Sequence, residues 1–219
     1  TPAPHWTTVL DIDALGKADG KSWVFHGADC LRPDEKRCLI ELSDGGEDAA
    51  VVREFDLDTA AFVGTGGFNL PRGKHRIAWE DADHLLVASE WTPGDLTPSG
   101  YPYIVKRLTR GQPLSAAAEI YRGGKADGGY GVSPEVLRDG QGRQLALIDR
   151  PLDTFRHETW VVAPRGVARL AMPLKEAVVE LVGGRAIVQL DEAWSVGGHA
   201  YPAGALVQLD LAKTKADPA

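Results

Sequence analysis

The seven serines are the residues whose surroundings could most directly support covalent chemistry. In α/β-hydrolases the nucleophilic serine sits in Gly-x-Ser-x-Gly, because the strained turn from strand to helix requires small neighbours. The contexts in this chain are GKSWV, ELSDG, VASEW, TPSGY, PLSAA, GVSPE and AWSVG, and none has this pattern. We therefore predict no catalytic residue in the chain itself.

The six histidines and the acidic turns match no complete metal or cofactor motif. His157 begins an HExxH pattern, but no second histidine follows at the required spacing. Residues 11–16 resemble a calcium loop for three positions, and Leu15 then stands where an oxygen ligand belongs. The glycine-rich residues 64–67 are not followed by a predicted helix, whose N-terminus a phosphate cradle would use. The sequence therefore predicts no metal site and no cofactor.

Cys30 and Cys38 flank a seven-residue turn and are the two cysteines of the chain. If the strands on either side are antiparallel neighbours, a disulfide can form where the two Cβ atoms lie about 4 Å apart. The alternative is a pair of buried thiols on the core face of the sheet. A disulfide would indicate the periplasm or the outside of a cell, since the cytosol keeps thiols reduced.

The aromatic residues offer one candidate binding region. Most of the tryptophans are expected to fill space between sheets, because buried aromatic rings contribute large apolar areas. Trp91 differs, since it opens the long loop 92–101 (TPGDLTPSGY). Long loops on a rigid scaffold often carry function, but no motif assigns roles to the individual residues of this one.

The composition limits the partners that this chain can have. Its 219 residues carry 24 Lys and Arg against 31 Asp and Glu, a formal net charge of −7. This balance argues against a nucleic-acid partner, which requires clustered basic residues. No apolar run approaches the ~20 residues that a membrane-spanning helix needs, and no signal peptide is visible. We therefore expect no nucleic-acid partner and no membrane partner.

The elements that must position these residues are predicted to be short strands. Helical periodicity is confined to residues 12–17 and 114–118. Apolar, strand-like runs recur instead, each after a polar turn and before a further strand. They start at 38, 85, 145 and 186, which gives spacings of 47, 60 and 41 residues. A loose period of about 50 residues is typical of four-stranded β-propeller blades.

We therefore predict an all-β fold, a partial β-propeller of about four blades of four-stranded antiparallel sheet. Each blade would cover the faces of its neighbours. A β-sandwich is the alternative, but a sandwich predicts no repeat. The expected parts are a blade end at 1–21, blades at 22–72, 73–127 and 128–173, and a partial blade at 174–219, with an outer strand of the earlier blade at 6–11.

These blades do not complete a propeller. A closed propeller needs roughly four to eight blades, whereas the predicted blades begin and end incomplete and the chain starts with Thr1 rather than Met. We therefore expect the chain to be part of a longer propeller. Its end blades would expose apolar faces and unpaired edges, so we predict pairing with the missing blades or self-association.

Several segments, taken in order, resemble one family. Residues 38–58 (CLIELSDGGEDAAVVREFDLD) resemble propeller blades of the prolyl oligopeptidase family of serine peptidases, above all its bacterial members. Further similar segments are 6–15 (WTTVLDIDAL), 67–71 (GFNLP), 99–114 (SGYPYIVKRLTRGQPL) and 201–209 (YPAGALVQL). No single motif is diagnostic, but the resemblance runs from about residue 6 to about residue 210.

The resemblance implies a role within a larger enzyme. In that family a seven-bladed propeller caps an α/β-hydrolase domain, which holds the catalytic Ser, Asp and His, and restricts access to oligopeptides. This chain would be the middle of the propeller, without the hydrolase domain. Its partners would be the remainder of the parent chain and a peptide substrate, and its location would be the periplasm or cytoplasm of a bacterium.

Two other functions remain open from the sequence. A propeller can act as a non-enzymatic platform that binds other proteins. A propeller can also carry its own active site, as in a glycosidase or lactonase, which would require paired carboxylates on strand ends. The sequence does not place two carboxylates together on one face.

Overall fold

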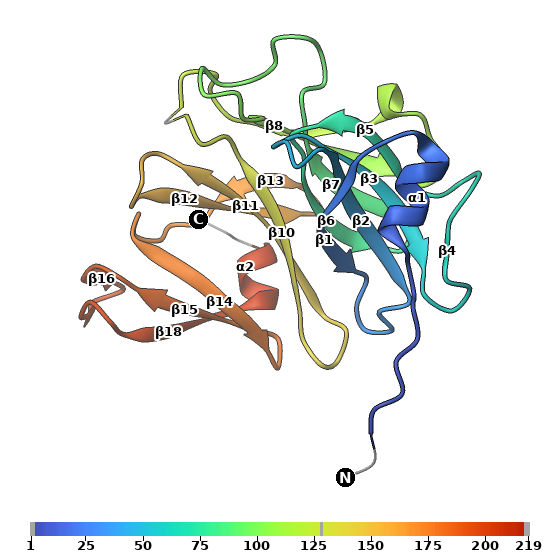
Figure 1. Ribbon diagram of the computed structural model, residues 1–219. Helices are drawn as coiled ribbons and strands as arrows, with labels where there is room; N and C mark the ends of the chain where they lie inside the picture. Colours follow the sequence, from blue (N-terminus) through green and yellow to red (C-terminus); the bar gives the residue numbers. More distant parts are fainter. Residues whose placement is uncertain (1–2, 128, 217–219) are drawn as a thin grey trace. The chain divides into compact units, whose positions relative to one another are not determined.

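The computed structural model describes residues 3–127 and 129–216, and nearly all of its regular structure is β-strand (Figure 1). The chain forms two compact units. The first unit comprises residues 1–74 and 110–114, and the second unit comprises residues 75–109 and 115–219. No helix within the described residues is long and apolar enough to cross a membrane.

The first unit is one antiparallel sheet preceded by a short helix. Its strands follow the order β1–β2–β3–β4, and β5 also pairs with β3. The buried side chains of Cys38, Ile40, Leu42 and Phe55 form the core on one face. The elements are α1 (Ile12–Asp19), β1 (Trp23–Cys30), β2 (Arg37–Asp44), β3 (Ala50–Asp56), β4 (Ala61–Phe62) and β5 (Asn69–Gly73).

The segment before this sheet corrects one sequence prediction. Residues 6–11, where we predict an outer strand, form no strand, because a strand without a neighbour leaves its backbone groups unpaired. The chain enters α1 instead, where the Asp11 carboxylate accepts a hydrogen bond from the Ala14 N–H at 2.8 Å. Gly20 ends the helix with a left-handed φ of 65°. The residues that partly resemble a calcium loop therefore form a helix cap.

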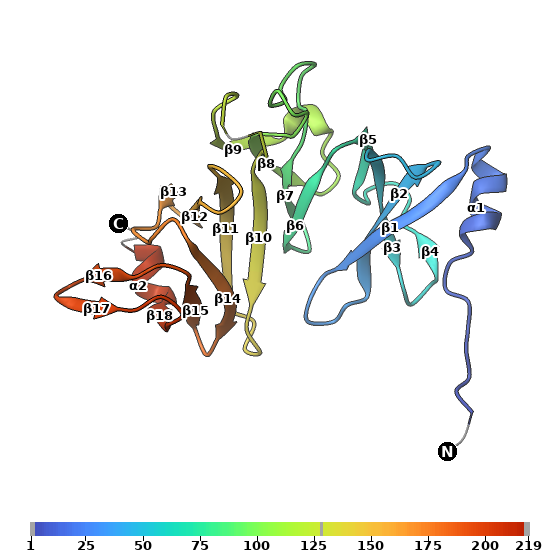
Figure 2. The ribbon, with the colours of Figure 1, turned by 60° about the vertical axis from the view of Figure 1, so that its left-hand side comes forward.

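The described part of the second unit contains three larger sheets that follow one another along the chain and a two-stranded hairpin (Figure 2). Two are four-stranded, in the orders β6–β7–β8–β9 and β10–β11–β12–β13, and the third has the order β14–β15–β18. The first sheet has β6 (Arg76–Asp81), β7 (His84–Ala88), β8 (Ile104–Thr109) and β9 (Ala118–Arg122), with the 3-10 turn η1 (Leu114–Ala116) before β9. The second has β10 (Ser133–Arg138), β11 (Gln144–Pro151), β12 (His157–Ala163) and β13 (Gly166–Arg169). The last sheet has β14 (Glu176–Val182), β15 (Arg185–Leu190) and β18 (Leu206–Asp210), and the hairpin β16 (Trp194–Val196) and β17 (His199–Tyr201) lies between β15 and β18 in the chain.

The sheets of the second unit pack face to face. Leu86 and Val105 of the first sheet share a core with Ile148 of the second. On the other face of the second sheet, Leu147 packs in a core with Val188 of the third. Strand β11 lies between these two cores, which explains why its apolar run is continuous rather than alternating. These sheets confirm the predicted all-β fold of antiparallel, four-stranded units.

The last helix in the described part of the chain was not predicted from the sequence. In α2 (Leu211–Ala216), the Asp210 carboxylate caps the first turn by accepting hydrogen bonds from the N–H groups of Ala212 and Lys213, at 3.0 and 3.1 Å. Leu211 is buried in the core shared by the second and third sheets. Tertiary packing therefore supports a helix that is too short to be stable by itself.

Candidate functional site

The loop that follows β7 is held against its own unit. Trp91 donates a hydrogen bond from Nε1 to the Ile104 carbonyl at 3.0 Å, and the Lys106 Nζ lies 4.8 Å from the centre of its ring. The Lys125 Nζ donates to the Gly94 carbonyl at 2.7 Å. Trp91, the expected exposed aromatic residue of this loop, is therefore half-buried and serves to anchor the loop.

Exposed aromatic rings lie on other loops of the second unit. Tyr130 is 42% exposed and Phe155 is 77% exposed. The Tyr130 hydroxyl is 2.8 Å from the Thr154 Oγ1, which ties the two loops together. The Arg76 guanidinium lies 5.5 Å from the centre of the Tyr101 ring and donates to the Tyr130 carbonyl at 3.4 Å.

A polar pocket of about 380 Å³ lies between β10, β11, β12 and β14. Its charged lining residues are Glu135, Asp149 and His157. Burial raises the pKa of Glu135 and of Asp149 above the usual range, and the His157 charge opposes part of the shift at Asp149. These residues were not predicted from the sequence as a site, since they belong to three strands and share no motif.

His157 stands between two carboxylates at the edge of this pocket. Its Nε2 lies 3.2 Å from the Glu176 Oε1 and its Nδ1 lies 3.3 Å from the Asp149 Oδ1. The Thr159 hydroxyl donates to the same Glu176 oxygen at 2.6 Å. A nucleophilic hydroxyl needs a hydrogen bond to its base. The Thr159 hydroxyl instead donates its hydrogen bond to the Glu176 carboxylate, so it is not arranged as a nucleophile.

Two serines do contact a histidine, and both pairs were missed from the sequence. The Ser43 Oγ is 2.8 Å from the His26 Nε2, and the Ser89 Oγ is 3.0 Å from the His75 Nδ1. Ser43 is only 1% exposed and Ser89 is 9% exposed. Each pair resembles the first half of a serine triad, but burial keeps a peptide carbonyl away from either hydroxyl.

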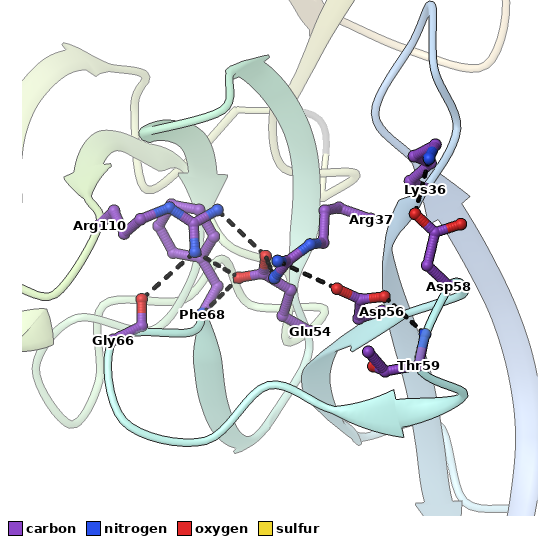
Figure 3. Close-up of polar contacts among 9 residues, drawn as sticks. All are labelled: Lys36, Arg37, Glu54, Asp56, Asp58, Thr59, Gly66, Phe68 and Arg110. Atoms are coloured by element: carbon purple, nitrogen blue, oxygen red, sulfur yellow. Dashed lines mark hydrogen bonds and ion pairs between the residues drawn. The ribbon is translucent and has the colours of Figure 1, made fainter.

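The first unit holds a cluster of charges around Glu54, whose side chain is fully buried (Figure 3). Both carboxylate oxygens bind Arg110, at 2.9 and 3.1 Å, and Oε1 is 3.4 Å from the Arg37 Nη1. The Phe68 N–H donates to Oε2 at 2.8 Å. Arg37 also pairs with Asp56 at 3.0 Å. We call Glu54, Arg37, Arg110 and Phe68 the Glu54 cluster, and its hydrogen bonds satisfy the buried carboxylate.

The predicted cysteine pair lies on adjacent strands. Cys30 of β1 is directly opposite Cys38 of β2 in the register of the sheet. Their sulfur atoms are bonded in the structure, 2.00 Å apart. Within the described ranges, no group of three or more His, Cys, Asp or Glu side chains could hold a metal ion.

Comparison with known proteins gives the family. The sequence model of one family, described as the N-terminal β-propeller domain of prolyl oligopeptidase, matches residues 2–160. This range is well over half of the chain. The chain belongs to the prolyl oligopeptidase family.

Two curated relatives extend the match to almost the whole chain. An uncharacterized peptidase of Sinorhizobium fredii is 45% identical over 99% of this chain, and an uncharacterized peptidase of Rickettsia prowazekii is 25% identical over 98%. The chain covers 30% and 31% of the length of these two relatives. It therefore spans about a third of the proteins that it matches.

Solved structures have the same fold. A post-proline cleaving enzyme from Rickettsia typhi gives a TM-score of 0.85 at 24% identity, with 99% of this chain and 33% of that chain covered. Oligopeptidase B from Leishmania major gives a TM-score of 0.61 at 10% identity, with 96% and 28% covered. The predicted propeller fold and the predicted family are confirmed.

The Glu54 cluster draws its residues from segments that resemble the prolyl oligopeptidase family. Glu54, Phe68 and Arg110 belong to the three separate segments 38–58, 67–71 and 99–114 that resemble propeller blades of the family. The structure brings these three segments together through hydrogen bonds to one carboxylate.

Proposed function

We propose that this chain is the gating, substrate-restricting part of a serine peptidase of the prolyl oligopeptidase type that hydrolyses oligopeptides. The observation that carries the proposal is the match of residues 2–160 to the N-terminal propeller domain of that family. The parent enzyme would cleave the peptide bond through an acyl-enzyme intermediate. The chain itself contributes a rigid, β-sheet wall that limits which molecules reach the catalytic serine.

The local chemistry supports a chain without its own catalytic triad. Ser43 on β2 and Ser89 directly after β7 each contact a histidine, and both are buried rather than presented to substrate. The pocket histidine, His157, bonds to carboxylates and not to a hydroxyl. A serine nucleophile must be reachable by the substrate and activated by a base at the same time. The two serine–histidine pairs have the base but are buried, and His157 has no serine partner in this arrangement.

The partners follow from exposed apolar side chains at strands of each unit. On β1, an edge strand of its sheet, Val24 is 42% and Phe25 is 53% exposed. On β14, an edge strand of the last sheet, Val179 is 53% and Val182 is 56% exposed. We propose that further blades of the parent chain cover these surfaces, and that the isolated chain self-associates through them.

An activity-based fluorophosphonate probe tests the catalytic part of this proposal. The full-length parent should be labelled at one serine outside this segment, and the 219-residue chain should remain unlabelled at every serine. A parent that hydrolyses peptides without being labelled would overturn the serine mechanism. Labelling of Ser43 or Ser89 in the isolated chain would overturn the assignment of catalysis to the rest of the parent.

The alternative is a non-enzymatic propeller that binds other proteins. The exposed rings of Tyr130 and Phe155 favour it, because exposed aromatic residues are common in binding surfaces. Under this alternative the parent would bind a peptide or protein and leave it intact. Incubation of the parent with a mixture of oligopeptides, followed by mass spectrometry, distinguishes cleavage from binding alone.

A further inference from the structure

The polar pocket contains a histidine whose two ring nitrogens both face carboxylates. The Glu176 Oε1 faces Nε2 at 3.2 Å and the Asp149 Oδ1 faces Nδ1 at 3.3 Å. A neutral imidazole carries one N–H, whereas an imidazolium carries two. Only the protonated ring can therefore donate a hydrogen bond to Glu176 and also present a positively charged N–H to Asp149.

The two carboxylates are poorly satisfied without that proton. The Glu176 side chain is 1% exposed, and its Oε2 accepts no hydrogen bond from any described residue. The Asp149 Oδ1 is buried too, and the described residues give it no hydrogen bond, since its contact with His157 is an ion pair without hydrogen-bond geometry. Burying a charge without a partner is costly, so a positive charge on His157 stabilises both groups.

The three residues come from neighbouring sheets of the second unit. Asp149 and His157 belong to β11 and β12 of the second sheet, and Glu176 is the first residue of β14 in the third. The backbone N–H of His157 also donates a hydrogen bond to the Leu174 carbonyl, just before β14, at 2.9 Å. The contact through the imidazole therefore joins the start of the third sheet to the second sheet.

We propose that His157 is a pH-sensitive clamp that holds β14 against the second sheet when protonated and loosens this contact when it loses its proton. Deprotonation leaves an imidazole lone pair facing one of the two carboxylates. The resulting repulsion and the loss of a charge-assisted hydrogen bond weaken the start of β14 first. If the gating role proposed above is correct, such loosening would also make the gate sensitive to pH.

The surrounding charges act in the same direction. The hydrogen bond to Glu176 raises the pKa of His157 above its usual value, and the charge of Asp149 adds to this effect. A raised histidine pKa stabilises the folded state below the usual pKa of about 6.5, and this stability is lost as the pH rises through the folded pKa. Burial raises the pKa of Asp149, an effect that His157 and Arg76 oppose and that the Glu176 charge reinforces. Burial also raises the pKa of Glu135 on β10, and the Asp149 charge adds to this shift. Carboxyl groups with raised pKa values also favour the folded state on the acidic side.

Hydrogen exchange on the intact chain tests the clamp. Protection factors of the β14 amides should fall as the pH rises above the usual histidine pKa of about 6.5, while those of β2 in the first unit should not. For each unit by which the pKa of His157 is higher in the clamped state than in the loosened state, protection should change about tenfold. The His157→Gln variant should remove this pH dependence. The matched control is His84→Gln, because His84 contacts Asp81 at 2.9 Å in an exposed hairpin and should leave the dependence unchanged.

A second measurement keeps the test decisive if His157→Gln does not fold. Two-bond proton–nitrogen spectra of the wild-type imidazoles should show that His157 stays protonated above about pH 6.5, the usual histidine pKa. The Glu176→Gln substitution should lower the titration midpoint of His157. A His157 midpoint at or below that usual value would overturn the clamp. Protection of β14 that does not change with pH, or that changes equally in His157→Gln, would overturn it as well. None of these readouts depends on peptidase activity, so failure of the clamp is separate from failure of the proposed function.

Discussion

At the residue scale, the Glu54 cluster is the most complete charge network of the first unit. Its central carboxylate is fully buried, yet Arg110 binds both oxygens and Phe68 supplies a backbone N–H. The Arg110 guanidinium also lies 4.6 Å from the centre of the Phe68 ring, a cation–π contact. A buried ion pair adds little net stability, but removal of one partner leaves an uncompensated charge.

The Arg110→Met substitution should therefore destabilise the first unit strongly. We expect a loss of about 3 kcal/mol in the free energy of unfolding, the low end for a broken buried pair, because Arg37 remains next to Glu54. The matched control is Arg122→Met, which removes a two-point pair with Glu119 that is 50% and 39% exposed. The control should cost far less, because an ion pair between exposed side chains contributes little to stability. Urea denaturation of both variants measures the difference, and equal losses would contradict the role of burial.

At the element scale, the β1–β2 hairpin depends on a covalent link as well as on its ladder. Cys30 and Cys38 are opposite each other in this ladder, eight residues apart in the chain. The disulfide closes the turn between them and restricts the unfolded chain more than the folded one. Since the cytosol keeps such bonds reduced, the state of this pair in cells also reports on the compartment.

The Cys30→Ser, Cys38→Ser double variant should be less stable than the oxidised protein. For a loop of this length the expected loss is about 2–3 kcal/mol in the free energy of unfolding. A reducing agent should lower the stability of the wild-type chain by a similar amount and leave the double variant unchanged. Alkylation followed by mass spectrometry reports the oxidation state directly. Two alkylated cysteines in the native protein without reductant would show that the thiols are free.

At the scale of the whole molecule, we expect the exposed apolar side chains on edge strands to govern how the chain behaves alone. Phe25 lies on the edge strand β1, where unpaired backbone groups and an apolar side chain are available together. Edge strands of this kind promote association with other strands. The same surfaces would be covered in a longer chain by the neighbouring blades that we propose.

Sedimentation velocity at several concentrations should show self-association of the 219-residue chain. Phe25→Glu should weaken it, since a charge on an edge strand opposes strand pairing. Phe155→Glu provides the matched control, because Phe155 is 77% exposed but lies in the turn between β11 and β12. A monomer at all concentrations, or equal effects of the two substitutions, would contradict association through β1.

The sequence alone determined the strands and the family. Apolar runs such as 85–88 and 145–148 lie between turn residues, and hairpin geometry depends on neighbours within a few positions, so local patterns were enough to predict the sheets. The segments 38–58, 67–71 and 99–114 were also enough to indicate the prolyl oligopeptidase family. The prediction of a strand at 6–11 was wrong, because a strand requires a neighbouring strand, which local patterns do not guarantee.

Only the tertiary structure decided which charged groups meet. Glu54 and Arg110 are 56 residues apart in the chain, and Asp149, His157 and Glu176 come from three strands of two sheets. Each of these residues has the pattern of an ordinary surface charge in its own segment. Their burial, pairing and pKa shifts depend on the distance between side chains and on the exclusion of water, and both are fixed only when the sheets pack against one another.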